Sequence, residues 1–236
     1  MKKIKTSVIL ATYNEKENIN KLISAILNIF KKNNLECNIV VVDDNSPDKT
    51  ADIVRKKYRR NKKIKIIVRK NEKGLATAIK RGIEESDGEI LVFMDTDFSH
   101  DPGLIPKMIR LTKNYEVVSG SRYIKGGGIE TKSYRKIATT IMEIYIRIIL
   151  GTNIKDFTNG FVAVRRDLLD NLNLEEIFYG YGDYCIRLFY YALKRKAKIL
   201  EIPAFYKFRK EGGSKTNILS HGLQYALEVL KLRFKC

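Results

Sequence analysis

Two carboxylates spaced one residue apart are the sharpest chemical feature of the sequence. Asp95 and Asp97 flank a threonine and directly follow the apolar run of residues 91–94. Alternate side chains of an extended segment point to the same side, so this pair can share one cation. Carboxylate oxygens favour Mg²⁺ or Mn²⁺. The alternative is a strand-to-helix turn in which Asp97 or Ser99 caps the helix that begins near Pro102. We favour the metal site, because the pair ends a strongly apolar strand.

A second acidic pair, Asp43 and Asp44, ends the apolar run of residues 40–42. Asp44 taken alone is ambiguous, because it could also form an Asx turn ahead of Ser46 and Pro47. The carboxyl ends of parallel strands meet at one edge of a sheet, and ligands bind at that edge. We therefore expect both acidic pairs to lie at the same ligand site.

Alternating β-rich and helical segments position these carboxylates. Strands are predicted at residues 7–11, 39–42, 64–68 and 89–94, and helices at residues 16–31, 48–60, 75–85 and 103–113. Repeated β-α-β units imply right-handed crossovers and a mostly parallel sheet that is buried on both faces. A further strand at residues 117–123 enters the glycine run at residues 126–128, which we interpret as a turn.

The charge balance and the cysteines narrow the class of protein. The 236 residues include 45 Lys and Arg against 27 Asp and Glu, a formal net charge of +18, which favours an anionic partner. Cys37, Cys185 and Cys236 form no C-x-x-C pattern, so we expect a reducing compartment and neither a disulfide framework nor a zinc site. We also expect no secretion signal and no membrane span, because no apolar stretch reaches the ~20 residues that cross a bilayer.

Two amphipathic segments, at residues 133–150 and 217–236, follow in the second half of the chain. We predict one domain over residues 1–216 and an amphipathic C-terminal helix over residues 217–236. Apolar stripes of this kind more often pack against the protein's own core. The net charge of +18 shifts the expectation toward at least one of the two helices lying in an anionic membrane surface.

A series of ordered motifs runs through the chain. They are found at residues 8–19, 41–50, 73–75, 94–100, 120–123, 156–161, 201–203 and 209–215. Together they resemble the inverting family 2 glycosyltransferases, and within them the dolichol-phosphate mannose synthases. Several motifs in one order are far more specific than any one of them. The resemblance implies an α/β fold of the GT-A type: a Rossmann-like, mostly parallel sheet flanked by helices.

The resemblance also implies which residues bind a nucleotide-sugar donor. The nucleotide would lie against Ala11, Tyr13 and Glu15. Its base or ribose would be held by Val42 and Asp44.

The resemblance further implies which residues bind the sugar, the diphosphate and a Mg²⁺ or Mn²⁺ ion. These would be held by Asp95, Thr96 and Asp97, and Ser99 matches a position next to the metal in some relatives. Residues 180–184 match the family's acceptor-side segment poorly, so we infer no role for them.

The basic residues bear on the acceptor. An alcohol acceptor needs a general base, whereas a phosphate acceptor is already an anion and needs cations that hold it. Arg122, Arg209 and Lys215 match the family positions that supply such cations. Each of them alone is equally well explained as a solvated surface side chain. We predict Asp97, Arg122 and Arg209 as catalytic residues, and we also assign Arg122, Arg209 and Lys215 to binding.

The sequence therefore predicts an enzyme that transfers a hexose, with mannose from GDP-mannose as the expected donor, onto dolichyl or another polyprenyl phosphate with inversion. It would be a peripheral protein on the cytoplasmic face of a membrane. The alternative is a family 2 transferase that uses UDP-glucose or another nucleotide sugar, or a non-lipid acceptor. A non-catalytic protein that binds nucleic acid is disfavoured, because RNA-binding aromatic motifs are absent and the acidic pairs would repel a polyanion.

Overall fold

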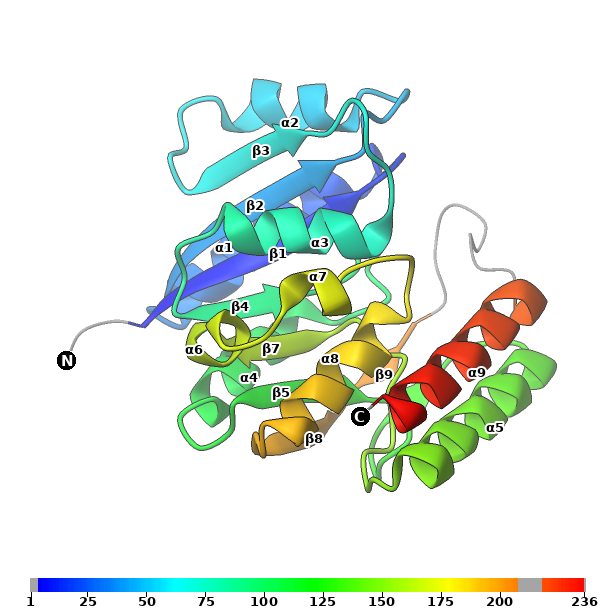
Figure 1. Cartoon of the computed structure of the whole chain (residues 1–236). Helices are drawn as coiled ribbons and strands as arrows, with labels where there is room; N and C mark the ends of the chain where they lie inside the picture. Colours follow the sequence, from blue (N-terminus) through cyan, green and yellow to red (C-terminus); the bar gives the residue numbers. More distant parts are fainter. Residues whose placement is uncertain (1–3, 208–217, 236) are drawn as a thin grey trace.

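A seven-stranded sheet forms the centre of the computed structural model (Figure 1). The structure describes residues 4–207 and 218–235. In spatial order the strands are β3 (Ile64–Val68), β2 (Glu36–Asp43), β1 (Lys5–Thr12), β4 (Ile90–Phe93), β7 (Val162–Arg165), β5 (Val117–Ser121) and β8 (Ile199–Pro203). All pairings are parallel except those of β7, which runs antiparallel to both β4 and β5. The predicted α/β fold with a mostly parallel sheet is confirmed.

Helices flank the sheet. They are α1 (Ile19–Lys32), α2 (Thr50–Tyr58), α3 (Leu75–Glu84), α4 (Ile105–Leu111), α5 (Ser133–Leu150), α6 (Arg166–Asp170), α7 (Leu174–Ile177), α8 (Tyr184–Lys194) and α9 (Ile218–Phe234). A short 3₁₀ helix, Pro102–Leu104, precedes α4, and the Asp101 side chain accepts a hydrogen bond from the backbone N–H of Gly103 at 2.8 Å. Asp101 is therefore the cap of this turn, and neither Asp97 nor Ser99 has that role.

Burial on both faces accounts for the unbroken apolar strands. Successive side chains of a strand point to opposite faces of the sheet. In β1, Val8 and Leu10 pack with α1, α2 and α4, whereas Ile9 packs with α3 and α8. All three side chains are fully buried, and each such burial contributes about 1.5–3 kcal/mol to folding. The apolar runs that end at the acidic pairs are thus the core strands of the sheet.

The strand order places a crevice at one edge of the sheet. β1 lies between β2 and β4. The chain adds β2 and then β3 on one side of β1, and it adds β4 on the other side. Ligands bind at such a reversal, beside the carboxyl ends of the strands. The antiparallel β7 brings a further segment to this edge, because Val162 at its start pairs with Phe93 at the end of β4. Loops from both halves of the chain converge there.

The glycine run at residues 126–128 corrects one expectation. Gly128 belongs to a short strand, β6 (Gly128–Ile129), which pairs in parallel with β9 (Phe205–Tyr206). A Cβ on Gly128 would lie 2.8 Å from the Phe205 ring, so this close pairing needs a glycine. The prediction of a turn through Gly128 was therefore wrong, because the strand is too short to give an alternating pattern.

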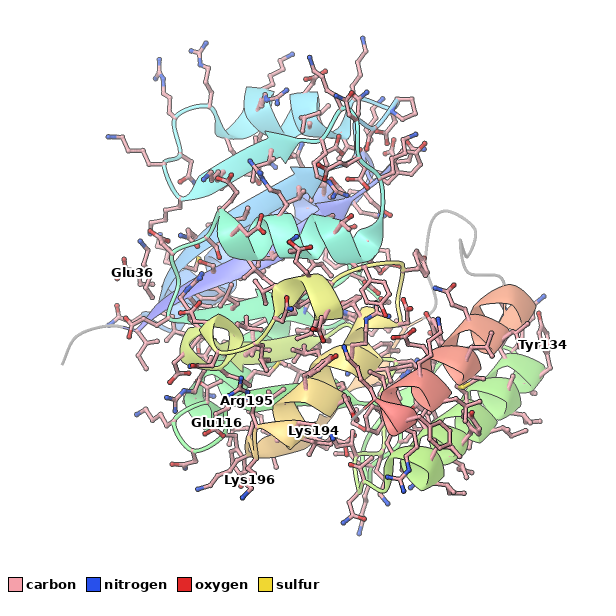
Figure 2. All side chains as sticks on the ribbon, viewed as in Figure 1. Glu36, Glu116, Tyr134, Lys194, Arg195 and Lys196 are labelled. Atoms are coloured by element: carbon pink, nitrogen blue, oxygen red, sulfur yellow. The ribbon has the colours of Figure 1, made fainter. Side chains whose placement is uncertain are left out.

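α5 and α9 lie side by side next to the sheet (Figure 1). The Tyr145 hydroxyl on α5 donates to the Ala226 carbonyl on α9 at 3.2 Å. The outward side chains of both helices are apolar and exposed; they are Tyr134, Ile137, Ile141, Ile144 and Ile148 on α5, and Leu223, Leu227, Leu230 and Phe234 on α9. We call these nine side chains the α5/α9 apolar face. Figure 2 shows Tyr134 at its outer end.

The α5/α9 apolar face excludes the alternative that both stripes simply pack on the core. Ile148 is 72% exposed and Phe234 is 78% exposed. Among the described residues, no helix combines the length and the hydropathy that a membrane span requires. The C-terminal helix is confirmed, whereas the predicted boundary between residues 216 and 217 lies outside the described part of the chain.

Candidate active site

A cavity of about 500 Å³ opens at the carboxyl edge of the sheet, a size suited to a small-molecule ligand. Its lining comes from the ends of β1 and β4, the start of α3, the segment before β7, and parts of α8 and α9. Of the residues predicted from the sequence, the lining includes Ala11, Tyr13, Glu15, Asp44, Asp95 and Thr96. It does not include Val42, Asp97, Ser99 or Arg122.

The two carboxylates of the Asp-Thr-Asp motif differ in exposure. The Asp95 side chain is 45% exposed, whereas Asp97 is only 6% exposed. Asp97 Oδ1 accepts a hydrogen bond from the backbone N–H of Ser99 at 3.0 Å. Phe98, between them, has a left-handed φ of 61°, a strained conformation for a residue with a side chain and one that is often found at functional loops. The place of Ser99 next to a metal stays a prediction.

His100 fixes the backbone of Asp95. Its Nδ1 accepts a hydrogen bond from the Asp95 N–H at 3.1 Å, and its ring stacks on Phe161 with 5.1 Å between centroids. Burial lowers the pKa of His100, so the imidazole is neutral at pH 7. Because Nδ1 accepts, the proton resides on Nε2, which lies 3.6 Å from Asp95 Oδ2. Both ring nitrogens of His100 thus face Asp95.

Asp44 anchors the loop at Gly74, which lines the cavity. Its Oδ1 accepts from Arg69 Nε at 2.7 Å, and its Oδ2 accepts from the backbone N–H of Gly74 at 2.8 Å. Arg69 is 6% exposed and also donates to the Gly74 carbonyl at 2.9 Å. Gly74 has a φ of 140°, which favours glycine. Sequence reasoning missed Arg69, because an arginine after a strand has no pattern that separates it from a surface residue.

Asp43, not Asp44, forms the turn after β2. Asp43 Oδ1 accepts from the Ser46 N–H at 2.9 Å, and Oδ2 accepts from the Ser46 hydroxyl at 2.6 Å and the Thr12 hydroxyl at 2.9 Å. Asp43 is 1% exposed. The expectation that the whole Asp43–Asp44 pair lies at the ligand site was therefore wrong. The carboxylates of adjacent residues in a strand point to opposite faces, so only one of them can reach the cavity.

Next to this loop the cavity is lined by an aromatic ring and a cation. Tyr13 is 37% exposed, and Lys73 Nζ lies 5.3 Å from the centroid of its ring. Glu15 is 8% exposed, and its carbonyl accepts from the N–H of Ile19 at the start of α1. Val42 is fully buried and lies outside the cavity lining. The structure thus brings Tyr13 and Glu15 to the cavity, and Val42 supports it from the core.

Arg122 follows β5 and forms a salt bridge with Asp156. Its Nε donates to Asp156 Oδ2 at 2.8 Å, and NH2 donates to Asp156 Oδ1 at 2.6 Å and to the Thr158 hydroxyl at 2.8 Å. Burial disfavours its charge, but Asp156 outweighs burial and raises the pKa of Arg122. Thr158 lines the cavity, so the guanidinium lies directly behind the lining. The other two predicted cations, Arg209 and Lys215, lie outside the described residues.

Part of the cavity is lined by residues to which the sequence analysis assigned no role. They are Tyr181 and Gly182 before α8, Tyr184 and Cys185 in its first turn, and Tyr225 on α9. Gly182 lies against the Tyr225 hydroxyl so closely that a Cβ would overlap it. Burial raises the pKa of the Cys185 thiol, so it stays protonated. The only usable signal was the glycine spacing around Tyr181, since tyrosines on amphipathic helices resemble core residues.

The acidic residues fit a divalent cation that arrives with its ligand. Asp95 and Asp97 offer hard oxygen donors, and in the described part of the chain no group of three or more acidic, His or Cys side chains could hold a metal. Mg²⁺ is commonly bound by one or two carboxylates together with substrate phosphates and water. The donor set therefore suits a metal that is shared with a diphosphate.

Comparison with known proteins places this site in a family. The model of glycosyl transferase family 2 matches residues 7–172. The chain belongs to this family. The match runs from residue 7 in β1 through β7 and includes the Asp-Thr-Asp motif, so the predicted glycosyltransferase family is confirmed.

Curated relatives of this family 2 chain include mannosyltransferases. The dolichol-phosphate mannosyltransferase of Pyrococcus furiosus is 39% identical over 220 residues, which are 90% of this chain and 59% of the relative. The dolichol-phosphate mannosyltransferase of Saccharomyces cerevisiae is 30% identical over 243 residues, 98% of this chain and 89% of the relative. The undecaprenyl-phosphate mannosyltransferase of Micrococcus luteus is 30% identical over 88% of this chain and 85% of the relative. The chain thus spans about three fifths of the length of the first of these.

A solved structure confirms the fold. Glucosyl-3-phosphoglycerate synthase from Mycobacterium tuberculosis, crystallised with Mn²⁺, UDP and glucosyl-3-phosphoglycerate, superposes with a TM-score of 0.72. The two chains are 19% identical, and the match covers 98% of this chain and 80% of the other. At this level of identity the likeness concerns the fold, which agrees with the predicted GT-A architecture.

Proposed function

We propose that the protein transfers mannose from GDP-mannose, with inversion, onto the phosphate of dolichol or another polyprenol. One observation carries this proposal: a single cavity is lined by Tyr13, Lys73 and Gly74, which we call the nucleotide end, by the strand-end carboxylate Asp95, and by Tyr181, Tyr184 and Tyr225, which we call the acceptor end. Arg122 lies behind the lining residue Thr158. The names of the mannosyltransferase relatives support the sugar and the acceptor class.

The nucleotide end would hold the donor by preformed contacts. The Asp44–Arg69 pair fixes the loop at Gly74, and Tyr13 offers an exposed ring on which a base can stack. A preorganised loop binds its ligand with a smaller loss of entropy. Tyr13 and Lys73 are therefore the residues that we assign to the base and to the negative charge of the nucleotide.

The centre of the cavity would hold the sugar diphosphate. Asp95 and Asp97 would bind Mg²⁺ or Mn²⁺, which when present supplies positive charge for the diphosphate leaving group. His100 holds the Asp95 backbone through Nδ1 and faces its carboxylate through Nε2, so this acid is oriented before a ligand binds. Thr96 lines the cavity beside it.

Around Tyr184 the described lining contains tyrosines, glycine and a protonated cysteine, and the nearby carboxylate, Asp95, is the one that we assign to the metal. A phosphate acceptor needs no base, because its oxygen is already an anion that can attack the anomeric carbon as the diphosphate leaves. Arg122 donates to the Thr158 hydroxyl from behind the lining, so we assign it to orient Thr158 toward the acceptor phosphate.

The α5/α9 apolar face would bring the enzyme to its lipid acceptor. Contiguous exposed apolar side chains mark interaction sites, and amphipathic helices with an apolar outer face lie in membrane interfaces. The net charge of +18 favours an anionic membrane surface. We assign the protein to the cytoplasmic face as a peripheral enzyme, because nucleotide sugars are cytoplasmic substrates and the described helices do not span a bilayer.

The proposal is tested by transfer of radiolabelled sugar from GDP-mannose, UDP-glucose and UDP-N-acetylglucosamine to polyprenyl phosphate, with label measured in the organic phase. We expect label from GDP-mannose, with loss of label on addition of EDTA and in Asp97→Asn. The surface variant Asp170→Asn is the matched control, since Asp170 is exposed. Label from UDP-glucose alone would contradict the donor, and label only in a water-soluble product would contradict the lipid acceptor.

A further inference from the structure

Four consecutive backbone N–H groups, those of residues 155–158, donate to two carboxylates on different elements. Glu201 on β8 accepts from Lys155 at 2.8 Å and from Asp156 at 3.0 Å. Glu143 on α5 accepts from Phe157 at 2.8 Å and from Thr158 at 3.1 Å. This segment has no regular secondary structure, so its backbone groups are satisfied mainly by side chains. The two glutamates therefore determine its path.

Glu143 makes the contact that reaches the cavity. Its Oε1 also accepts from the Thr158 hydroxyl at 2.7 Å, and Thr158 lines the cavity together with Gly160. Glu143 is 2% exposed, although it lies on a helix whose outer side chains are exposed. A carboxylate can accept all three of these hydrogen bonds, whereas the protonated acid must give up the one from the Thr158 hydroxyl, and an amide must place its NH₂ group against a backbone N–H.

The charged groups that act on Glu143 are one acid and one cation. Asp156 lies on the same segment, and Arg122 NH2 is 3.7 Å from Glu143 Oε1. Burial, and next the charge of Asp156, raise the pKa of Glu143 to about 7, against the opposing effects of Arg122 and of the Thr158 and Phe157 hydrogen bonds. The Tyr123 hydroxyl also lies within electrostatic reach, but it titrates only at alkaline pH because burial raises its pKa.

We propose that Glu143 is a positioning residue: its ionised carboxylate holds residues 156–160, and with them the Arg122 guanidinium, in the geometry that accepts the phosphate substrate, and acidification releases this hold. The inference rests on the proposed transfer to a polyprenyl phosphate. The direction of the pH dependence follows from the raised pKa of Glu143. The carboxylate that accepts three hydrogen bonds exists above about pH 7, and it is lost as the pH falls below that value. Glu143 touches no substrate and acts only through Thr158 and Arg122.

The test compares wild type with Glu143→Gln across pH 6–8.5, because glutamine has the shape of the protonated acid and does not titrate. The phosphate acceptor itself has a second pKa of about 6, so the ratio of the two turnover numbers is the quantity to measure. We expect wild type to exceed the variant by about 10-fold to 100-fold at pH 8, the size of a small misplacement of reacting groups. The ratio should approach one as the pH falls below 7.

Two further readouts separate positioning from a general loss of structure. The affinity for GDP with Mn²⁺ should stay within about twofold of wild type, because the nucleotide end is built on other elements. Glu36→Gln is the matched control: Glu36 is exposed at the opposite edge of the sheet (Figure 2), and its ratio to wild type should be one at every pH. If the ratio of the wild-type turnover number to that of Glu143→Gln stayed constant with pH, the proposal would be overturned.

A measurement on wild type covers the case in which the variant does not fold. The amide resonances of Phe157 and Thr158 should shift with pH at a midpoint near 7, as Glu143 titrates. A midpoint near the ordinary value for glutamate would contradict the proposal. Absence of transfer in wild type would refute the proposed function alone, because the amide titration does not depend on any substrate.

Discussion

The α5/α9 apolar face supports a quantitative prediction about membrane binding. We consider the double substitution Ile141→Gln and Ile148→Gln, in which glutamine keeps a high helix propensity. The two isoleucines are 60% and 72% exposed, so the variant removes apolar surface without opening the core. Full burial of such a side chain contributes ~1.5–3 kcal/mol, and scaling by these exposed fractions gives about 2–4 kcal/mol for the pair on insertion. This corresponds to a loss of vesicle affinity of about 30-fold to 1,000-fold.

The assay is co-sedimentation with vesicles that contain anionic lipid, at two salt concentrations. The variant should lose affinity at both, whereas the control Lys56→Gln on α2 should lose little, because α2 lies on the far side of the sheet from α5 (Figure 1). Transfer to a short, water-soluble prenyl phosphate should be unchanged in the double variant. Affinity within about threefold of wild type would refute the assignment of this face to a lipid surface.

Three further substitutions test the cavity. Arg69→Gln should destabilise the fold by about 3–5 kcal/mol, measured by denaturant unfolding, because it leaves the buried Asp44 carboxylate without its partner; an unchanged midpoint would contradict the anchoring role. Arg122→Ala should raise the KM for the acceptor at least about 10-fold while GDP affinity is retained. A collapse of GDP affinity with normal acceptor kinetics would show that Arg122 acts at the donor instead. Gly182→Ala should cost about 1–3 kcal/mol or displace Tyr225, and equal stability and acceptor KM would contradict the close packing between them.

The elements and part of the cavity lining were predictable because their signals are local. β3 was placed at its observed bounds, and α5 matches its predicted segment, since each has an unambiguous period or apolar run. Asp95 and Thr96 were found because they end a core strand in a distinctive motif. The sequence could not predict that Asp43 forms the turn after β2 and that Asp44 anchors the loop at Gly74. These roles depend on the face of the strand to which each carboxylate points.

The acceptor end depends on contacts between distant segments and was not predictable in the same way. Tyr184 and Tyr225 are 41 residues apart in the sequence, and nothing in either helix marks the face that meets the cavity. Glu143 lies in the amphipathic segment of residues 133–150, and nothing in the sequence shows that its carboxylate is buried and bonded to Thr158. Arg122 was recognised from its motif, but its pairing with Asp156 depends on the antiparallel course of β7.

The antiparallel β7 also divides the chemistry along the chain. The cavity lining that precedes β5 in the chain comes from residues 11–96, and the described lining that follows β5 comes from residues 158–225. The four residue pairs between β4 and β7 join these stretches in the sheet. Under the proposed function, we expect donor preference and acceptor preference to depend on different stretches of the chain. A chimaera joined between β4 and β5 should combine the sugar nucleotide of one parent with the acceptor of the other.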